Sequence, residues 1–331
     1  MSNSVSGLHH DITDVPGVTV GHASDMKART GVTVVLAPPE GARAGMHIGG
    51  SAASTRQADS LRPEHVVDRV HGICLCGGSG RGLDAAGGVQ ARLEEAGVGI
   101  RVVGHTIPIV PAAALFDLNF GGSSIRPDVT MGYDACRNAS GGPVQQGSVG
   151  AGTGATIGKL FGVVQAMKGG VGSASVVCDG LIVGALVVLN AFGDIRDPHG
   201  NLIAGARTAP QSLELADARR LLTQGTARSR QISVENTTLS VVAVNANADK
   251  ITASRIAAQA ALGLGRVISP FQSQVDGDLT IVLCTGNQEA DADRIALLAS
   301  DVLQAAVVNA VRYADGFGLL PAWKDLGGVA G

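Results

Sequence analysis

The sequence predicts an α+β protein, a layered sandwich in which sheets and helices form separate layers. β-branched apolar runs at residues 32–36, 70–76 and 181–189 indicate strands in the first two-thirds of the chain. The two longest helical patterns, residues 249–267 and 290–313, both come near the end. Because strands and helices do not alternate regularly, a doubly wound parallel sheet is not expected. The length of 331 residues, with no visible linker or internal repeat, fits one large domain.

The composition argues against several classes of protein. Charged residues make up 16% of the chain and hydrophobic residues 45%, which argues against disorder, and no basic stripe indicates a nucleic-acid partner. No apolar run reaches membrane-spanning length, and the polar residues 1–10 lack an apolar signal core. The five cysteines form no Cys-x-x-Cys pair, which is typical of reduced thiols. We therefore expect a cytoplasmic protein, and its Gly- and Ala-rich composition favours close contacts in an oligomer.

The N-terminal part of the chain predicts two adjacent strands followed by a long loop. Residues 18–22 and 32–36 form apolar runs joined by a polar connection. Residues 41–60 follow no regular pattern, so we expect an irregular loop there. Loops of this length inside compact domains are often functional.

A glycine-rich turn follows the predicted strand at residues 70–76. Its sequence is Gly77-Gly78-Ser79-Gly80-Arg81-Gly82, and it leads into a predicted helix at residues 83–95. Such a turn lets a ligand approach backbone N–H groups at a helix N-terminus. The glycine spacing does not match the dinucleotide-binding pattern. Tight helix–strand packing and a catalytic-site loop both remain open readings.

The middle of the chain contains a lone lysine beside the most glycine-dense stretch. Residues 108–118 start extended and are expected to become a short helix after Pro111. Residues 147–158 then end at Lys159, where the requirements of a phosphate-binding P-loop are not met. Lys159 is either a solvated surface charge or, given the apolar run that follows it, a site residue.

A hairpin and a polar strand end come next. Residues 172–190 read as two strands around the turn Asp179-Gly180, and Asn190 ends the second strand. A buried amide there needs partners, and it is commonly a cap and sometimes an oxyanion donor. We expect an exposed loop at residues 194–207 and a short amphipathic helix at 212–222. The polar residues 223–233 would then give the chain the slack that a cleavage requires.

The stretch Glu235 to Val244 organises the rest of the sequence. Its second half is a continuous β-branched run, typical of a strand buried on both faces. Asn236-Thr237-Thr238 stands at the mouth of this strand without a turn residue. If the bond between Asn236 and Thr237 were cut, Thr237 would carry both a hydroxyl nucleophile and a free amine base. The alternative is a strand with a polar edge.

The C-terminal part contains two carboxylates that are separated by one residue. The helix at residues 249–267 stops at Ser269-Pro270, and Asp276-Gly277-Asp278 turns into a strand at residues 279–284. Two residues apart on an extended backbone, the carboxylates point the same way. A calcium-like or turn-capping role is the alternative to a catalytic pair.

Together these stretches resemble the L-aminopeptidase/D-esterase family, which includes β-peptidyl aminopeptidases and nylon-oligomer hydrolases. The resemblance spans almost the whole chain in family order. It rests on residues 30–35, Gly77-Gly78-Ser79 with residues 82–86, residues 108–113, residues 150–155, Asn236-Thr237-Thr238 and Asp276-Gly277-Asp278.

The resemblance implies an αββα four-layer sandwich, similar to N-terminal nucleophile hydrolases and to ornithine acetyltransferase. It also implies self-cleavage between Asn236 and Thr237 into an α chain (1–236) and a β chain (237–331). Thr237 would then attack short peptides, β-peptides or other oligoamides as an aminopeptidase or amidase. A homotetramer that acts without a cofactor or metal is implied as well.

The resemblance assigns roles to four further residues. Lys159 and Asn190 match a catalytic Lys and Asn of the nylon-oligomer branch, and Asp276 and Asp278 match its paired acids. Asn190 can face the developing oxyanion, and Lys159 can donate to it or lower the proton affinity of the Thr237 amine. The two acids can hold that amine and the hydroxyl.

Two departures from the family pattern concern the substrate. We expect Gly78, Ser79, Arg81 and Phe116 to bind it, yet Gly80-Arg81 replaces the usual Ala-Phe, and residues 49–56 lack the usual Pro-Gly pair. Arg81 would pair with a substrate carboxylate, or else point to solvent or pair with Asp84. Two other functions also fit the sequence, an acyltransferase of the ornithine acetyltransferase type and an uncut, inactive binding protein.

Overall fold

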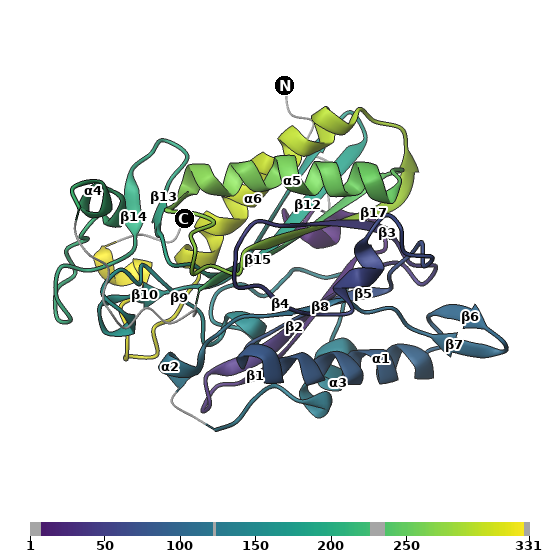
Figure 1. Cartoon of the computed structure of the whole chain (residues 1–331), viewed down its shortest axis with the longest axis horizontal. Helices are drawn as coiled ribbons and strands as arrows, with labels where there is room; N and C mark the ends of the chain where they lie inside the picture. The colour runs from purple at the N-terminus through teal and green to yellow at the C-terminus, as the bar shows by residue number, and fades with distance from the viewer. Residues whose placement is uncertain (1–7, 122–123, 226–235, 328–331) are drawn as a thin grey trace.

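The protein is built of four layers, in the order helices, sheet, sheet, helices (Figure 1). The computed structural model describes residues 8–121, 124–225 and 236–327. Most of the polar segment 223–233, which we expected to provide slack, lies outside these residues. The layered α+β architecture predicted from the order of the elements is confirmed.

The N-terminal sheet places the first two predicted strands side by side. Its five strands are, in spatial order, β1 (Thr19–Asp25), β2 (Thr30–Leu36), β5 (Gly72–Cys76), β8 (Ala112–Ala114) and β4 (Ser54–Arg56). All neighbours are antiparallel except β5 and β8, which run parallel. The predicted pairing of the first two strands is therefore confirmed.

The C-terminal sheet contains the strand that follows Asn236. Its five strands are, in spatial order, β11 (Gly170–Cys178), β12 (Leu181–Asn190), β15 (Thr237–Ala246), β17 (Leu279–Gln288) and β3 (Arg43–Ile48). β15 lies in the middle, antiparallel to β12 and parallel to β17, and is buried along nearly its whole length, as its β-branched run predicts. The predicted hairpin turn between β11 and β12 is confirmed by positive φ angles at Asp179 and Gly180.

Helices cover the outer face of each sheet. α1 (Ala85–Glu95) and α3 (Val129–Arg137) pack on the N-terminal sheet, and α5 (Lys250–Val267) and α6 (Ala292–Arg312) on the C-terminal sheet (Figure 1). The side chain of Asp249 accepts a hydrogen bond at the start of α5, and that of Asp291 does so at the start of α6. By length and composition α6 could cross a membrane, but 67% of its most apolar window is buried inside the protein. It serves as a core helix.

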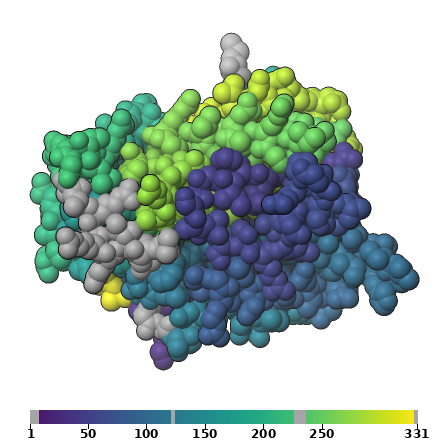
Figure 2. All heavy atoms as spheres, viewed as in Figure 1, coloured from purple at the N-terminus to yellow at the C-terminus, as the bar shows by residue number. Residues whose placement is uncertain are grey.

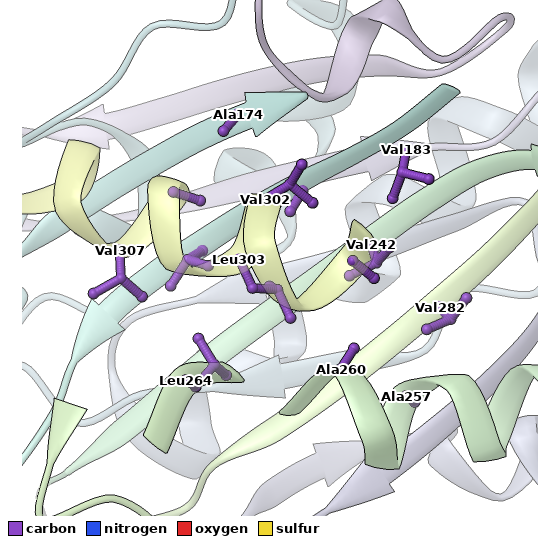
Figure 3. Packing of buried hydrophobic residues seen from close by; sticks show 14 of the residues in the cluster. Ala174, Val183, Val242, Ala257, Ala260, Leu264, Val282, Val302, Leu303 and Val307 are labelled. Carbon is purple, nitrogen blue, oxygen red and sulfur yellow. The ribbon is translucent and has the colours of Figure 1, made fainter. Parts of the chain in front are cut away.

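Three hydrophobic cores separate the four layers. One lies between the two sheets, one under α1 and α3, and the largest under α5 and α6. This largest core contains Val302, Leu303 and Val307 of α6 together with β-strand residues such as Val183 and Val242 (Figure 3). In the space-filling view the purple and blue N-terminal segments lie directly against the green and yellow C-terminal helices (Figure 2). The packing is continuous from one layer to the next.

Two predictions for the N-terminal half are wrong. Residues 41–60 are not one irregular loop, because they contain β3 and β4, which are edge strands of different sheets. No helix follows directly after Pro111, since residues 112–114 form β8 between β5 and β4. The short helix comes later, as α2 (Leu118–Gly121). In each case pairing with a distant strand overrides the local pattern.

Two further predictions, for the segment that connects β12 to β15, are wrong. Residues 194–207 contain β13 (Asp194–Arg196) and β14 (Leu202–Ala204), which form a small sheet with β16 (Ile268–Ser269). The two charged residues at the ends of this segment, Asp194 and Arg207, are buried. Hydrogen bonds offset the cost of their burial, because Asp194 accepts backbone N–H groups and Arg207 donates to backbone carbonyls. The predicted helix at 212–222 is reduced to α4 (Ala218–Thr223). The remaining strands are β6 (Ile100–Val102), β7 (His105–Ile107), β9 (Thr156–Ile157) and β10 (Met167–Lys168).

Candidate active site

Asn190 and Thr237 lie directly opposite each other at the ends of two central strands. In the antiparallel pair of β12 and β15 the residue across from Thr237 is Asn190. Asn190 is fully buried, and Thr237 is 5% exposed. Directly opposite residues in such a pair have Cα atoms only about 4.5–5.5 Å apart. The fold thus brings together two candidate residues that are far apart in the sequence.

Lys159 joins this pair through the Asn190 side chain. The Lys159 ammonium donates to the Asn190 side-chain Oδ1 at 2.8 Å and to the Asn190 backbone carbonyl at 2.9 Å. The backbone N–H of Thr156 also donates to Oδ1, at 2.9 Å. The Asn190 Nδ2 group in turn donates to the backbone carbonyl of Phe116 at 3.1 Å. These contacts fix which end of the Asn190 amide is the donor.

The peptide bond before Thr237 lies in a confined setting. The Thr237 hydroxyl is 2.5 Å from the carbonyl oxygen of Asn236. The same carbonyl accepts a hydrogen bond from the backbone N–H of Gly277 at 2.8 Å. A Cβ atom at position 277 would stand 2.9 Å from the Thr237 hydroxyl oxygen, so a larger residue there would displace the hydroxyl or the turn. Glycine between the two acids is therefore required by this close approach.

Asp278 lies beside the candidate nucleophile and bonds the residue after it. Its Oδ1 accepts the backbone N–H of Thr238 at 2.6 Å, and its Oδ2 accepts the N–H of Gln272 at 3.0 Å. Burial raises the pKa of Asp278 to about 8, and the negative charge of Asp276 adds to the shift. Asp278 is therefore harder to ionise than a solvent-exposed aspartate.

Asp276 is held on the other side of the turn. Its Oδ2 accepts both the hydroxyl of Ser273, at 2.5 Å, and the Ser273 backbone N–H, at 3.0 Å. Its Oδ1 accepts the backbone N–H of Phe192 at 3.2 Å. Burial raises the pKa of Asp276 as well. In the described part of the chain the hydrogen bonds of both acids go to residues around Thr237 rather than to Thr237 itself.

The segment before β4 packs against this acidic turn. The N–H groups of Gly49 and Gly50 both donate to the Asp278 carbonyl, and the N–H of Ala52 donates to the Asp276 carbonyl. A Cβ on Gly50 would stand 2.3 Å from the Asp276 carbonyl oxygen, so glycine is needed there. The segment that departs from the family pattern thus supports the site through its backbone.

The predicted substrate loop reaches the site only in part. Ser79 donates its N–H to the Leu115 carbonyl at 2.9 Å, next to Phe116, whose carbonyl holds Asn190. Gly78 has a φ of 79° and donates to the buried Asp117 carboxylate at 2.9 Å. Arg81 is exposed on the 3₁₀ helix Ser79–Asp84, and no ion pair among the described residues includes it. The structure therefore brings the backbone of this loop, but not the Arg81 side chain, to the site.

Several residues of the cluster carried no clear signal in the sequence. Thr156, Gly277, Gln272 and Phe192 contribute backbone N–H groups, which any residue except proline has. Ser273 is different, because a serine three residues before an acidic residue matches the spacing of a capping box. That spacing could have indicated its bond to Asp276.

Comparison with known proteins shows the family. The model of peptidase family S58 matches residues 10–318. An uncharacterised aminopeptidase of Mycobacterium leprae is 36% identical over 95% of this chain and 93% of its own length. A 6-aminohexanoate-oligomer endohydrolase of Kocuria sp. is 28% identical over 90% of this chain and 85% of its own. The solved L-aminopeptidase D-Ala-esterase/amidase of Ochrobactrum anthropi, described as a variant of the Ntn hydrolase fold, covers 95% of this chain and 89% of its own with a TM-score of 0.68 at 21% identity.

The fold is similar to that of a solved hydrolase described as an Ntn variant, and the site places a buried threonine at the head of a central strand. The chain belongs to peptidase family S58. It is an amide-bond hydrolase, and the resemblance to the aminopeptidase and nylon-oligomer hydrolase group is confirmed.

Proposed function

We propose that the protein cuts its own chain between Asn236 and Thr237 and then uses Thr237 to hydrolyse amide bonds. The observation that carries this proposal is the position of the Thr237 hydroxyl beside the Asn236 carbonyl, inside a buried site. The cleavage would leave residues 1–236 and 237–331 as two chains of one folded unit.

The cleavage proceeds in two steps. The Thr237 hydroxyl oxygen attacks the Asn236 carbonyl carbon, and the hydroxyl proton passes to the Thr237 nitrogen as the peptide bond breaks. This shift forms an ester between the two residues and frees the Thr237 amine. Water then hydrolyses the ester, giving the Asn236 carboxylate and restoring the Thr237 hydroxyl.

Gly277 provides the oxyanion donor for the first step. Negative charge develops on the Asn236 carbonyl oxygen during the attack, and the Gly277 N–H already lies 2.8 Å from that atom. A donor at this distance from a developing oxyanion typically lowers the activation free energy by about 3–4 kcal/mol. The bond needs no rearrangement, which favours cleavage from the folded state.

A different set of groups serves the substrate. The freed Thr237 amine takes the hydroxyl proton during attack on the amide and returns it to the leaving amine. Lys159 and Thr156 orient Asn190 across the strand pair from Thr237. Its side-chain amide serves as a hydrogen-bond donor for the substrate oxyanion. Asp276 and Asp278 hold the strand and the turn on the far side of Thr237.

We propose that the substrates are short peptides, β-peptides or related oligoamides. The support comes from the aminopeptidase and 6-aminohexanoate-oligomer endohydrolase names of the relatives. A free amine next to the scissile bond fits an aminopeptidase, and an internal amide fits an endohydrolase. Assays of one peptide series with free and acetylated N-termini separate these two modes, because only the endohydrolase cuts the acetylated members.

The test is mass spectrometry of the purified protein with two variants of one residue. The wild-type protein gives two masses, for 1–236 and 237–331. Thr237→Ala stays at full length and has no activity, because it lacks the nucleophile. Thr237→Ser keeps a hydroxyl and still gives two chains. A full-length Thr237→Ala protein with wild-type activity would overturn the proposal, and an uncut, inactive wild type would identify a binding protein.

We also propose that the enzyme is a cytoplasmic homotetramer. Leu262 of α5 and Leu297 of α6 are largely exposed on the outer helical layer, where contacts between subunits would cover them. The five free thiols fit a reducing compartment. A clean monomer in sedimentation velocity at micromolar concentration would contradict the tetramer.

A further inference from the structure

A second site is suggested by a pocket at the end of the molecule formed by β13, α4 and the C-terminal end of α5. The pocket has a volume of about 480 Å³, and its charged lining residues are Arg196, Asp217, Arg219, Arg220 and Arg266. Figure 1 shows α4 and β13 together at this end, with the β6–β7 hairpin at the opposite end. None of the lining residues belongs to the candidate active site.

The pocket concentrates positive charge in a protein that is otherwise slightly acidic. Four guanidinium groups line it against one carboxylate, whereas the whole chain has a formal net charge of −3. The single ion pair in the lining joins Arg196 to Asp217 at 2.8 Å, and no ion pair of the described residues includes Arg219, Arg220 or Arg266. Like charges gathered in a hollow repel each other and attract anions.

Arg196 is held in a fixed orientation at the edge of this pocket. Its side chain is 17% exposed, and its two terminal nitrogens donate to Asp217 and to the Gly200 carbonyl. Its Nε atom is buried and has no hydrogen-bond partner in the described residues. A buried donor without an acceptor carries a desolvation cost.

We propose that this pocket binds a small molecule that carries two or more phosphate or carboxylate groups. The planar guanidinium group matches both anions in bidentate geometry. A pocket of about 480 Å³ lies within the roughly 300–1,000 Å³ range of small-molecule sites, and it is larger than a single inorganic ion requires. Guanidinium groups on different elements, Arg196 on β13 and Arg266 on α5, favour a ligand with more than one anionic group.

The ligand would also tie together two segments that lead to the active site. β13 pairs with β16 through Ile195 and Ile268, and Arg266 is the last residue but one of α5, which β16 follows directly. The segment after β16 contains residues 272–273, whose N–H groups hold the two site carboxylates. A ligand that bridges Arg196 and Arg266 therefore stabilises β13 against this segment.

The test is calorimetric and thermal-shift titration of the purified wild-type protein with pyrophosphate and with citrate. Sodium chloride keeps the ionic strength equal in all samples. We expect saturable binding of at least one of the two anions and a rise in the unfolding temperature. The double variant Arg219→Gln/Arg266→Gln, which changes two exposed side chains outside the hydrogen-bond network, should bind at least tenfold more weakly. Arg196→Gln should do the same.

The control is Arg101→Gln on β6, at the opposite end of the molecule, which removes one charge and should bind like the wild type. Binding of pyrophosphate alone would identify a phosphate ligand, and binding of citrate alone a carboxylate ligand. The absence of saturable binding for both anions would overturn the proposal. An equal loss in Arg101→Gln and in the double variant would also overturn it, because attraction by overall charge would then be sufficient.

Discussion

Two buried lysines near each other in the chain have different surroundings. Lys159 is 7% exposed, and its ammonium donates to both the backbone and the side-chain oxygen of Asn190, opposite Thr237. Lys168 is fully buried, and its ammonium donates to the backbone carbonyls of Gly152, Ala155 and Gly169 at 2.8–2.9 Å. One lysine meets a side chain of the candidate active site, whereas the other closes a glycine-rich turn.

The difference shows that burial alone does not identify a catalytic lysine. A buried ammonium needs acceptors wherever it lies, and either backbone carbonyls or side chains can provide them. Burial lowers the pKa of Lys168 to about 7, yet its hydrogen bonds hold only backbone. By fixing the turn before Thr156, Lys168 supports Asn190 from a distance. The hydrogen-bond acceptors of a buried lysine therefore indicate its role. A lysine bonded to an active-site side chain takes part in the chemistry, and a lysine bonded only to backbone carbonyls supports the fold.

The sharpest test of this comparison is Lys159→Met. The variant loses the charge beside Asn190, so kcat/KM for a short peptide amide should fall about 10²–10³-fold, or roughly 3–4 kcal/mol. The assay uses the cut fraction of the variant, and thermal unfolding checks that it is folded. A kcat/KM within threefold of the wild type would place Lys159 with the supporting groups.

Lys168→Met should act on stability instead. Three buried carbonyls lose their donor at an individual cost of about 1–3 kcal/mol, partly offset because no ammonium is buried. We expect a net loss of about 2–4 kcal/mol in the free energy of unfolding, measured by urea titration. The kcat/KM of the folded, cut variant should stay within a few-fold of the wild type. Unchanged stability with lost activity would reverse the assignment of the two lysines.

The pH dependence of stability should separate the acidic pair from Lys168. The folded protein holds a proton on Asp278 up to a pKa of about 8, and the unfolded chain releases it near 4. The free energy of unfolding should therefore fall as the pH rises from 4 to 8. Lys168 has the opposite effect. Its pKa is about 7 in the folded protein and 10.5 in the unfolded chain, so between these pH values only the unfolded chain keeps the proton. The free energy of unfolding therefore rises with pH in this range.

Each contribution is at most about 1.4 kcal/mol per pH unit for one proton. Asp278→Asn should reduce the fall below pH 8, and Lys168→Met should reduce the rise above pH 7, in urea titrations at several pH values. Identical pH profiles for the wild type and Asp278→Asn would show that this carboxyl does not titrate abnormally.

Arg81→Phe is expected to have the smallest effect. The side chain is exposed and lies outside the Asn190–Thr237 cluster, so it reaches a substrate only if the substrate extends over the glycine-rich loop. The assay compares a dipeptide with its C-terminal amide. A loss of discrimination of about tenfold, or 1.4 kcal/mol, would show a contact with the substrate carboxylate. An unchanged ratio of kcat/KM would leave Arg81 as a surface charge.

The sequence by itself determined the positions of the two long C-terminal helices, the hairpin at Asp179-Gly180 and the position of Thr237 at the head of a buried strand. These features depend on neighbouring residues, because hydrophobic period, turn residues and β-branched runs act locally. The family motifs in the sequence also indicate Lys159, Asn190, Asp276 and Asp278 as site residues.

Only the tertiary structure decided which groups meet. Local sequence could not show that β3 joins the C-terminal sheet, or that Gly277 donates to the Asn236 carbonyl. It also could not separate Lys159 from Lys168, because both stand next to glycine-rich and apolar residues. The physical reason is that pairing, burial and hydrogen-bond partners depend on residues distant in sequence, and local propensity yields to these contacts when the chain packs.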